Sequence, residues 1–294
     1  MLDITKKVEE HRNAHCKPSA IPDGYEPREI SGVYVFEHTE DADACLVDEM
    51  ESILADSEAG EGLILSTGST FENPYKIMAE RRQRLAKILE NLMLINQDEL
   101  LGIKQDDPRS YHRYMRKRLF SKFPELDERN WIIPNPELGG EEALEIFIRQ
   151  LETVQKVRLA LLGIGPDADP ERKLAASPHI GFIEPGTPLD VLAKVVKLDR
   201  RTRHANGNGN ARDYPTHAIS HGPANVLKAE TIIMLAKGPK KKENINRVAL
   251  RNFNLKVAAS LVQIAKKNDG GRRKDVKILM DHAAAESTFK TLWY

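Results

Sequence analysis

Two short polar segments follow apolar, strand-like runs in the first third of the chain. Residues 63–65 lead into the turn Thr67-Gly68-Ser69-Thr70, and residues 92–95 lead into Asp98-Glu99. A turn rich in glycine and hydroxyl groups that opens a helix can hold a phosphate through N–H and O–H donors. A carboxylate at the end of a buried strand can take a proton from carbon or from water near neutral pH. Together the two segments predict a phosphate site beside an acid–base group.

Each segment taken alone also has a structural interpretation. Ser69 or Thr70 would serve as an ordinary helix N-cap, and Asp98 or Glu99 as a helix cap or a solvated acid. Sequence patterns in the rest of the chain are needed to choose between the functional and the structural interpretation.

The framework that must position these residues is an alternation of strand and helix patterns. Short β-rich runs, most of them apolar enough for strands buried on both faces, occur at residues 33–36, 63–65, 92–95, 157–162, 193–198, 231–236 and 276–280. Apolar residues recur at helical spacing within residues 46–54, 111–119, 144–154 and 253–264. The alternation predicts an α/β fold with a doubly wound, mostly parallel sheet and helices on both faces. Ligands collect at the strand ends of such sheets.

The chain is predicted to form one domain with an N-terminal extension. Residues 1–30 contain three prolines and the turn pair Asp23-Gly24, which favours an irregular polar extension. Residues 31–294 carry the alternating pattern and are expected to form the single domain. The Asn- and Gly-rich run at 206–210 predicts a loop.

Composition narrows the class of protein. The 294 residues carry 44 Lys and Arg against 44 Asp and Glu, so no overall field attracts nucleic acid or an anionic membrane. No apolar run approaches membrane-spanning length, and the N-terminus lacks a signal-peptide pattern. Cys16 and Cys45 form neither a disulfide framework nor a metal spacing. We therefore expect a cytoplasmic protein that binds neither nucleic acid nor membranes.

An ordered set of motifs resembles the glucosamine-6-phosphate deaminase family, which is related to 6-phosphogluconolactonase. The resemblance extends over residues 31–294, and its ordered set is more specific than any one motif. The matching segments are Thr67-Gly68-Ser69-Thr70, residues 96–100 and 107–115, Gly163-Ile164-Gly165, residues 179–185, residues 202–206, residues 222–230, residues 238–241, and Asp281-His282-Ala283 with residues 290–292.

The resemblance implies a Rossmann-like fold of the glucosamine-6-phosphate isomerase type and a reaction on an amino-sugar phosphate. Such an enzyme opens the sugar ring, moves a proton between C2 and C1 and releases ammonia, and it needs no metal or organic cofactor. By position, Asp98 would be the carbon base. His179 would assist ring opening, and Glu184 would hold its imidazole in the useful tautomer. Thr67, Gly68, Ser69 and Thr70 would receive the phosphate, with Lys241 as counter-charge.

The chain departs from the family pattern at two places. The family has Asp-Gly-His directly after its glycine-rich turn, whereas Asp167 here is separated from His179 by an insertion. Either Asp167 folds back to the site, or Asp169 replaces it, or the acid is lost. The family also carries an arginine soon after the segment matched by residues 202–206, and Arg212 is the nearest candidate for its phosphate contact.

Other functions remain open at this point. His217 and His221 have a zinc-like i, i+4 spacing, but they lack an intervening Glu and a third ligand, so we expect no metal site. A lactonase acting on a sugar-acid phosphate would use His179 to activate water, and a non-catalytic sensor would keep only the phosphate turn and Lys241. The expected partner is a small sugar phosphate. A homo-oligomer is possible, but the apolar pattern does not specify one.

Overall fold

A sheet of eight strands forms the centre of the protein in a computed structural model, which describes residues 1–16, 21–171, 173, 175–176, 178–207, 211–267 and 275–293. The pairing of β1 with β3 is antiparallel, and the other pairs are parallel. In spatial order the strands are β1 (Leu2–Asp3), β3 (Glu29–Phe36), β13 (Asp275–Asp281), β11 (Ala229–Ala236), β8 (Val157–Leu162), β4 (Gly62–Leu65), β5 (Met93–Asn96) and β7 (Trp131–Ile132).

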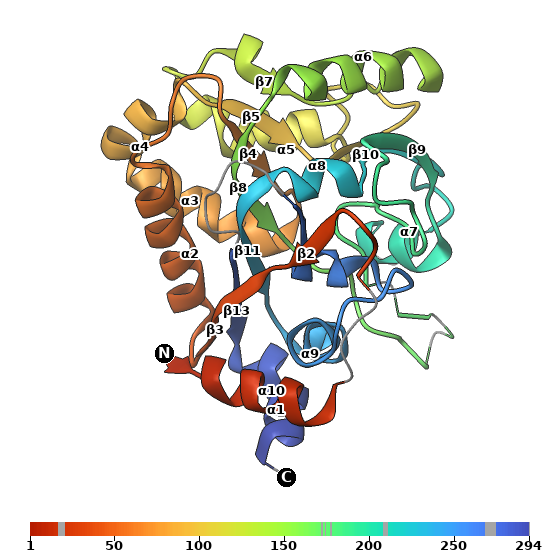
Figure 1. Cartoon of the computed structure of the whole chain (residues 1–294). Coiled ribbons are helices and arrows are strands. Elements are labelled where there is room, and N and C mark those ends of the chain that lie inside the picture. Colours follow the sequence, from red (N-terminus) through yellow and green to blue (C-terminus); the bar gives the residue numbers. More distant parts are fainter. Residues whose placement is uncertain are drawn as a thin grey trace.

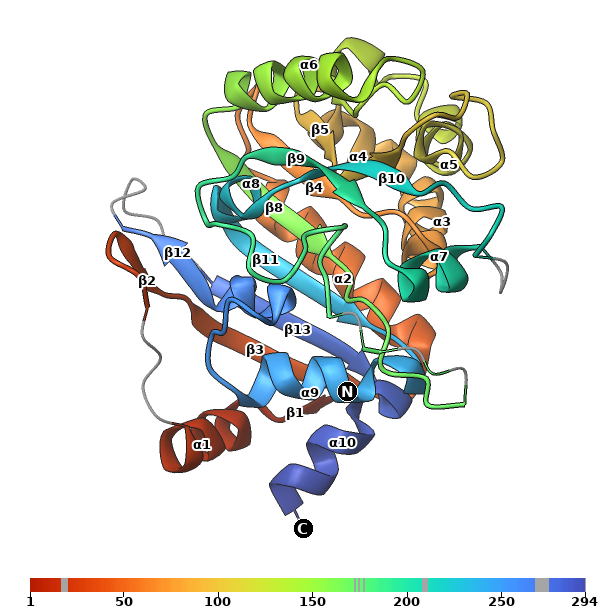
Figure 2. The ribbon, with the colours of Figure 1, turned by 90° about the vertical axis from the view of Figure 1, so that its right-hand side faces the viewer.

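Helices cover both faces of this sheet, with α2 to α4 along one side and α8 and α9 on the other (Figures 1 and 2). The helices are α1 (Thr5–His15), α2 (Thr39–Leu54), α3 (Glu72–Glu80), α4 (Arg82–Leu89), α5 (Tyr111–Arg118), α6 (Gly140–Thr153), α7 (Arg200–Asn206), α8 (Pro223–Leu227), α9 (Lys242–Leu250) and α10 (His282–Trp293). Shorter 3-10 helices are η1 (Ser69–Phe71), η2 (Phe120–Lys122), η3 (Glu128–Asn130), η4 (Pro239–Lys241) and η5 (Ala258–Gln263). Within the described ranges, no helix combines the length and apolarity that crossing a bilayer requires.

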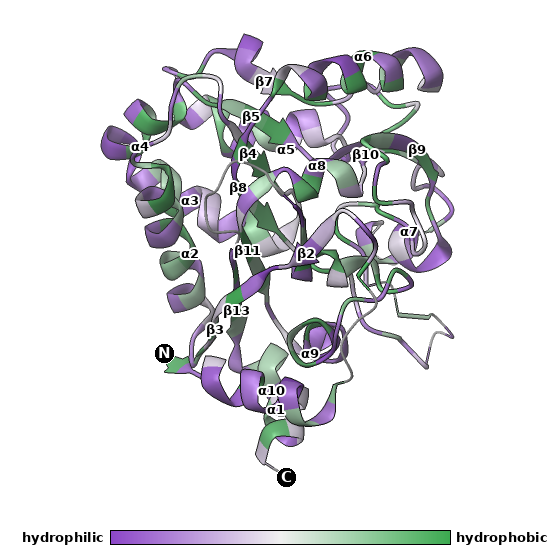
Figure 3. Ribbon diagram, in the orientation of Figure 1, coloured by the Kyte–Doolittle hydropathy of each residue, from purple (hydrophilic) through white to green (hydrophobic). Residues whose placement is uncertain are grey.

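The strands are apolar because both of their faces are buried. In β8, Leu159 and Leu161 pack in a core cluster with side chains of α2 to α5, whereas Ala160 and Leu162 pack in a second cluster with α6 and α9. All residues of β8 are buried. The hydropathy colouring shows hydrophobic central strands and many hydrophilic residues on the outer helices (Figure 3). The predicted doubly wound, mostly parallel sheet is confirmed.

One predicted strand lies in a different sheet. Residues 193–198 were expected in the parallel sheet, but β9 (Ala193–Lys197) pairs antiparallel with β10 (His217–His221), which also pairs antiparallel with β6 (Asp98–Leu100). Only two of the five residues of β9 are buried, so this strand has one wet face. A further pair is β12 (Ile264–Lys266) with β2 (Tyr25–Pro27).

Two other local predictions are wrong. Residues 253–264 do not form an α-helix: η5 is followed by β12, and the Ser260 hydroxyl contacts the backbone of Asn254 and Val257, an alternative to helical bonding. The N-terminal segment is not irregular either, because it contains β1 and α1, and Val8 of α1 is buried. The domain boundary at residue 30 stays a prediction. Within the predicted loop at 206–210, Asn206 ends α7, and residues 208–210 lie outside the described residues.

Candidate active site

A cavity of about 580 Å³ opens where β4, β5 and β8 reach their carboxyl ends. Its walls come from seven segments that are distant in sequence. They are the turn after β4, the link from β5 to β6, the start of α5, the loop after β8, residues 179–182, helix α7 and η4. Asp98 and His179 line the same cavity as the predicted phosphate turn.

The turn Thr67-Gly68-Ser69-Thr70 connects β4 to η1 and α3 and lines the cavity. Gly68 has φ of 99°, a conformation that favours glycine. The Tyr114 hydroxyl donates to the Gly68 carbonyl at 2.8 Å, and the Tyr75 hydroxyl donates to the Ser66 carbonyl at 2.8 Å. The Ser66 and Gly68 carbonyls are thus held by tyrosines, and the residues that open η1 line the cavity, an arrangement suited to an anion.

The adjacent acids Asp98 and Glu99 have opposite environments. Glu99 is fully buried and accepts hydrogen bonds from the Ser110 hydroxyl at 2.8 Å and from the backbone N–H groups of Tyr111 and His112 at 3.0 and 2.9 Å. It therefore stabilises the start of α5. Asp98 is also buried, lines the cavity and receives no such donor from the described residues. Burial, and then the nearby Glu99, raise the pKa of Asp98 well above its usual range.

His179 approaches the cavity on a segment that packs against Asp98. Gly181 has φ of 53°, and a Cβ at this position would lie 3.1 Å from Asp98 Oδ2. The Nδ1 atom of His179 is buried and has no hydrogen-bond partner among the described residues. Burial, and then the charge of Lys241, lower the pKa of His179 to about 4, so the imidazole is neutral at pH 7.

Glu184 does not orient His179, and that prediction is wrong. The Glu184 carboxylate accepts a hydrogen bond from Lys194 Nζ at 2.6 Å. Both residues line a neighbouring hollow of about 480 Å³ that shares His179 with the main cavity. A half-buried carboxylate is stabilised more by an ammonium group than by a neutral imidazole, which explains the choice of partner.

Asp167 is not among the described residues that line the cavity, and its prediction as a cavity acid is wrong. Its carboxylate accepts the backbone N–H groups of Glu243 at 3.0 Å and Asn244 at 2.8 Å, in the first turn of α9. Carboxylates are favoured there by the helix dipole. Asp169, the alternative, does line the cavity.

Three cations line the cavity: Lys240, Lys241 and Arg201. Lys241 Nζ donates to the Ile164 carbonyl, and burial lowers the pKa of Lys241 to about 8, with nearby Arg201 acting in the same direction. Arg201 is 9% exposed, and its Nε and Nη2 donate to the Asp167 carbonyl at 3.2 and 2.9 Å. Arg212, the predicted phosphate arginine, is exposed and lies outside the described cavity lining.

Sequence comparison identifies relatives over most of the chain. A glucosamine-6-phosphate deaminase of Staphylococcus aureus (strain JH9) is 32% identical over 223 residues, which span 75% of this chain and 81% of the relative. The chain belongs to the glucosamine-6-phosphate deaminase family. The same relative from strain Newman matches equally well. No family model matches the chain.

Solved structures related to this deaminase family member agree on the fold. A monomeric glucosamine-6-phosphate deaminase superposes with a TM-score of 0.74 and 26% identity, covering 87% of this chain and 99% of its own. The 6-phosphogluconolactonase from Trypanosoma cruzi has a TM-score of 0.66 and 15% identity, covering 89% and 96%. At that identity the lactonase supports the shared fold alone.

The cavity of this protein also contains residues that the sequence analysis did not assign to the site. Arg201 and Lys240 directly precede the recognised residues Thr202 and Lys241, so a search for cations beside the motifs would have found them. Tyr111 lines the cavity as well, and burial raises its pKa well above the usual range. Tyr111 lies within the matched segment 107–115, so the resemblance marked this stretch without assigning Tyr111 a role.

His217 and His221 are too far apart along β10 to bind one metal ion together. The two residues stand at the ends of β10, and four residues along a strand are about 13 Å apart. Within the part of the chain that the structure describes, no group of three or more His, Cys, Asp or Glu could hold a metal ion.

Proposed function

We propose that the protein converts a hexosamine 6-phosphate, glucosamine 6-phosphate or a close analogue, into the corresponding ketose phosphate and ammonia. Family membership supports this class of reaction. The observation that carries the proposal is the buried Asp98 carboxylate, which faces the cavity while its neighbour Glu99 is occupied at the start of α5.

The phosphate is proposed to bind the turn Thr67-Gly68-Ser69-Thr70 together with Lys241 and Arg201. Backbone and hydroxyl donors in the turn would contact the phosphate oxygens, and the two cations line the same cavity. Arg201 would take the place that the sequence assigned to Arg212. Its guanidinium is anchored through the Asp167 carbonyl, so little side-chain freedom is left to lose on binding.

The chemical steps divide between His179 and Asp98. A neutral imidazole has one donor and one acceptor nitrogen, so His179 can move a proton between the sugar hydroxyl and the ring oxygen as the ring opens. Asp98 would then take the proton from C2 and return it to C1. The resulting imine at C2 adds water, and the C–N bond breaks to release ammonia. Asp169 is the remaining cavity acid, and we propose it as the replacement for the displaced family aspartate.

The decisive experiment measures ammonia release from glucosamine 6-phosphate and acid release from 6-phosphogluconolactone. We expect ammonia from the first substrate, and a loss of about 10²–10⁴-fold in kcat in Asp98→Asn. Asp106→Asn, an exposed acid on the loop before α5, is the control and should keep full activity. Acid release without ammonia would identify a lactonase, and binding without turnover would identify a sensor; either result would overturn the proposal.

A further inference from the structure

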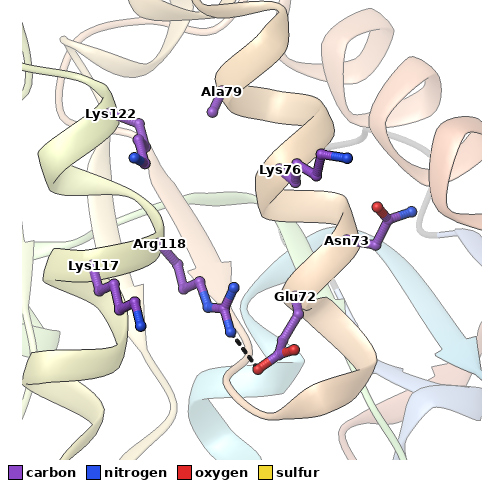
Figure 4. Close-up of a pocket in the computed structure, with 7 residues that line it drawn as sticks. All are labelled: Glu72, Asn73, Lys76, Ala79, Lys117, Arg118 and Lys122. Atoms are coloured by element: carbon purple, nitrogen blue, oxygen red, sulfur yellow. Dashed lines mark hydrogen bonds and ion pairs between the residues drawn. The ribbon is translucent and has the colours of Figure 1, made fainter.

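A second hollow lies outside the active-site cavity, between α3 and the segment formed by α5 and η2 (Figure 4). Its volume is about 440 Å³, within the range of small-molecule sites. We call it the α3–α5 groove. Its polar lining consists of Glu72, Asn73, Lys76, Lys117, Arg118 and Lys122.

The α3–α5 groove is strongly cationic although the chain as a whole has no net charge. Its lining has four basic side chains and one acid, Glu72, which already pairs with Arg118 at 2.5 Å. The Lys76 Nζ and Glu80 Oε1 atoms are 3.7 Å apart, which is long for an ion pair, and both side chains are largely exposed. This pair therefore neutralises little of the positive charge of the groove. Lys117 and Lys122 have no acidic partner among the described residues. Like charges gathered in one hollow repel one another, and a bound anion relieves that repulsion.

The α3–α5 groove is connected to the phosphate turn through Arg118. The Arg118 guanidinium pairs with Glu72, the first residue of α3, and also lies 5.7 Å from the ring centroid of Tyr114. The Tyr114 hydroxyl in turn donates to the Gly68 carbonyl. Figure 4 shows the Arg118–Glu72 pair reaching from α5 to α3. An anion that competes with Glu72 for Arg118 therefore acts on both helices that support the turn.

We propose that the α3–α5 groove binds a small phosphate-bearing anion, and that its occupancy changes the affinity of the active-site cavity for its own phosphate ligand. Lys117, Lys122 and Arg118 supply the charge, and Lys76 belongs to the α3 side of the lining. The binding part of this inference does not depend on the proposed reaction, because it rests on the groove alone. The coupling acts through Arg118, Tyr114 and Gly68.

The binding test is calorimetric titration with pyrophosphate at constant ionic strength. Lys117→Gln/Lys122→Gln should lose one binding event of the wild-type protein or weaken it by about tenfold. The control Lys6→Gln/Lys87→Gln removes the same charge from two exposed helix lysines elsewhere and should bind like wild type. Equal titration curves for the groove variant and wild type would overturn the proposal. The proposal would also be overturned if sodium chloride at matched ionic strength gave the same difference between the groove variant and wild type.

The coupling test measures turnover of glucosamine 6-phosphate at several pyrophosphate concentrations. Pyrophosphate in the active-site cavity competes with substrate in every variant. In wild type and in the control variant we expect the apparent KM to depend non-linearly on pyrophosphate concentration, because occupancy of the groove changes the affinity for substrate in addition to this competition. In the groove variant the apparent KM should rise linearly. A linear rise in all three proteins would refute the coupling. Absence of any turnover would instead count against the proposed reaction, while the calorimetric result would still decide binding.

Discussion

Two neighbouring carboxylates illustrate how the environment of a residue assigns its role. Asp98 and Glu99 are both buried and adjacent, but Glu99 accepts several hydrogen bonds at the start of α5 and Asp98 accepts none from the described residues. A carboxylate that is buried without donors holds its charge at a cost in free energy, and that cost makes it a better proton acceptor. The protein therefore places a carboxyl group with a raised pKa where the reaction needs a base.

The stability of Asp98→Asn tests this argument separately from catalysis. Because the folded protein raises the pKa of Asp98, the protonated form favours folding, and that contribution is lost as pH rises through the folded-state pKa. The uncharged amide should therefore give a melting temperature at pH 7 equal to or above that of wild type, while activity is lost. The difference should shrink at pH 4. A variant that is less stable than wild type at pH 7 would mean that Asp98 is a structural carboxylate like Glu99.

Substitutions of Arg201 and Arg212 should have different effects on phosphate binding. Arg201→Gln should raise KM for glucosamine 6-phosphate by about 10- to 100-fold, since a hydrogen bond to a charged group contributes about 1.5–3 kcal/mol. Arg212→Gln should leave KM within twofold, because Arg212 is exposed and not part of the described cavity lining. Steady-state kinetics of both variants measure the difference. The reverse ranking would restore Arg212 as the phosphate residue.

At the scale of elements, the segment from His179 to Phe182 sets the geometry of the base. Gly181→Ala adds a Cβ 3.1 Å from Asp98 Oδ2 and from Gln97 Oε1, and it also strains a residue with positive φ. Gly186→Ala is the matched control, because it has φ of 82° and nothing within 4 Å of the added Cβ. Both variants should lose about 1–2 kcal/mol of stability. Only Gly181→Ala should also lower kcat, by about 10²-fold; equal activity of the two variants would show that the contact with Asp98 does not matter.

The elements that the sequence predicts well are those whose residues are buried on both faces. A continuous apolar run such as residues 157–162 has one stable place, the centre of a parallel sheet, and β8 occupies those residues. Residues 193–197 contain Lys194 and Lys197 among apolar residues, and β9 has a wet face and pairs in the small antiparallel sheet. Composition cannot specify which strand is the neighbour. In residues 253–264, the contacts of Ser260 with the backbone replace the helix that the apolar spacing predicted.

The site was less predictable because side-chain partners depend on distances that spacing does not encode. The convergence of Asp98 and the phosphate turn follows from their places just after β5 and β4, and the structure brings His179, from the loop after β8, to the same cavity. The hydrogen-bond partners of Glu184 and Asp167 could not be predicted from the sequence. Glu184 pairs with Lys194, and Asp167 accepts the first N–H groups of α9. Both pairs of partners depend on the path that the loop after β8 takes, and the sequence pattern does not specify that path.

At the scale of the whole molecule, the sheet separates stability from chemistry. Its two faces hold the two large core clusters, and the cavity is confined to one edge, where seven segments meet. The strands bring these segments together, and the polar groups proposed for the reaction, such as Asp98 and His179, stand outside the core clusters, although Phe71 and Ile164 belong to both the cavity lining and a core cluster. Buried polar groups next to this edge nevertheless make the stability of the fold depend on pH.

His221 should account for part of the loss of stability in acid. It is fully buried, its Nε2 has no hydrogen-bond partner among the described residues, and burial lowers its pKa to about 3. The folded state therefore favours the neutral ring, so this contribution is complete above the unfolded pKa of about 6.5 and is lost as pH falls towards 3. Between pH 6.5 and pH 5 the loss is about 2 kcal/mol.

Urea unfolding of His221→Gln at pH 6.5 and pH 5 measures that contribution. The glutamine keeps a polar side chain but does not titrate, so its free energy of unfolding should fall less between the two pH values than that of wild type. His217→Gln changes the exposed histidine at the other end of β10 and should behave like wild type. If His221→Gln and His217→Gln lose the same stability on acidification, the acid sensitivity arises elsewhere, with His179 the next buried imidazole to test.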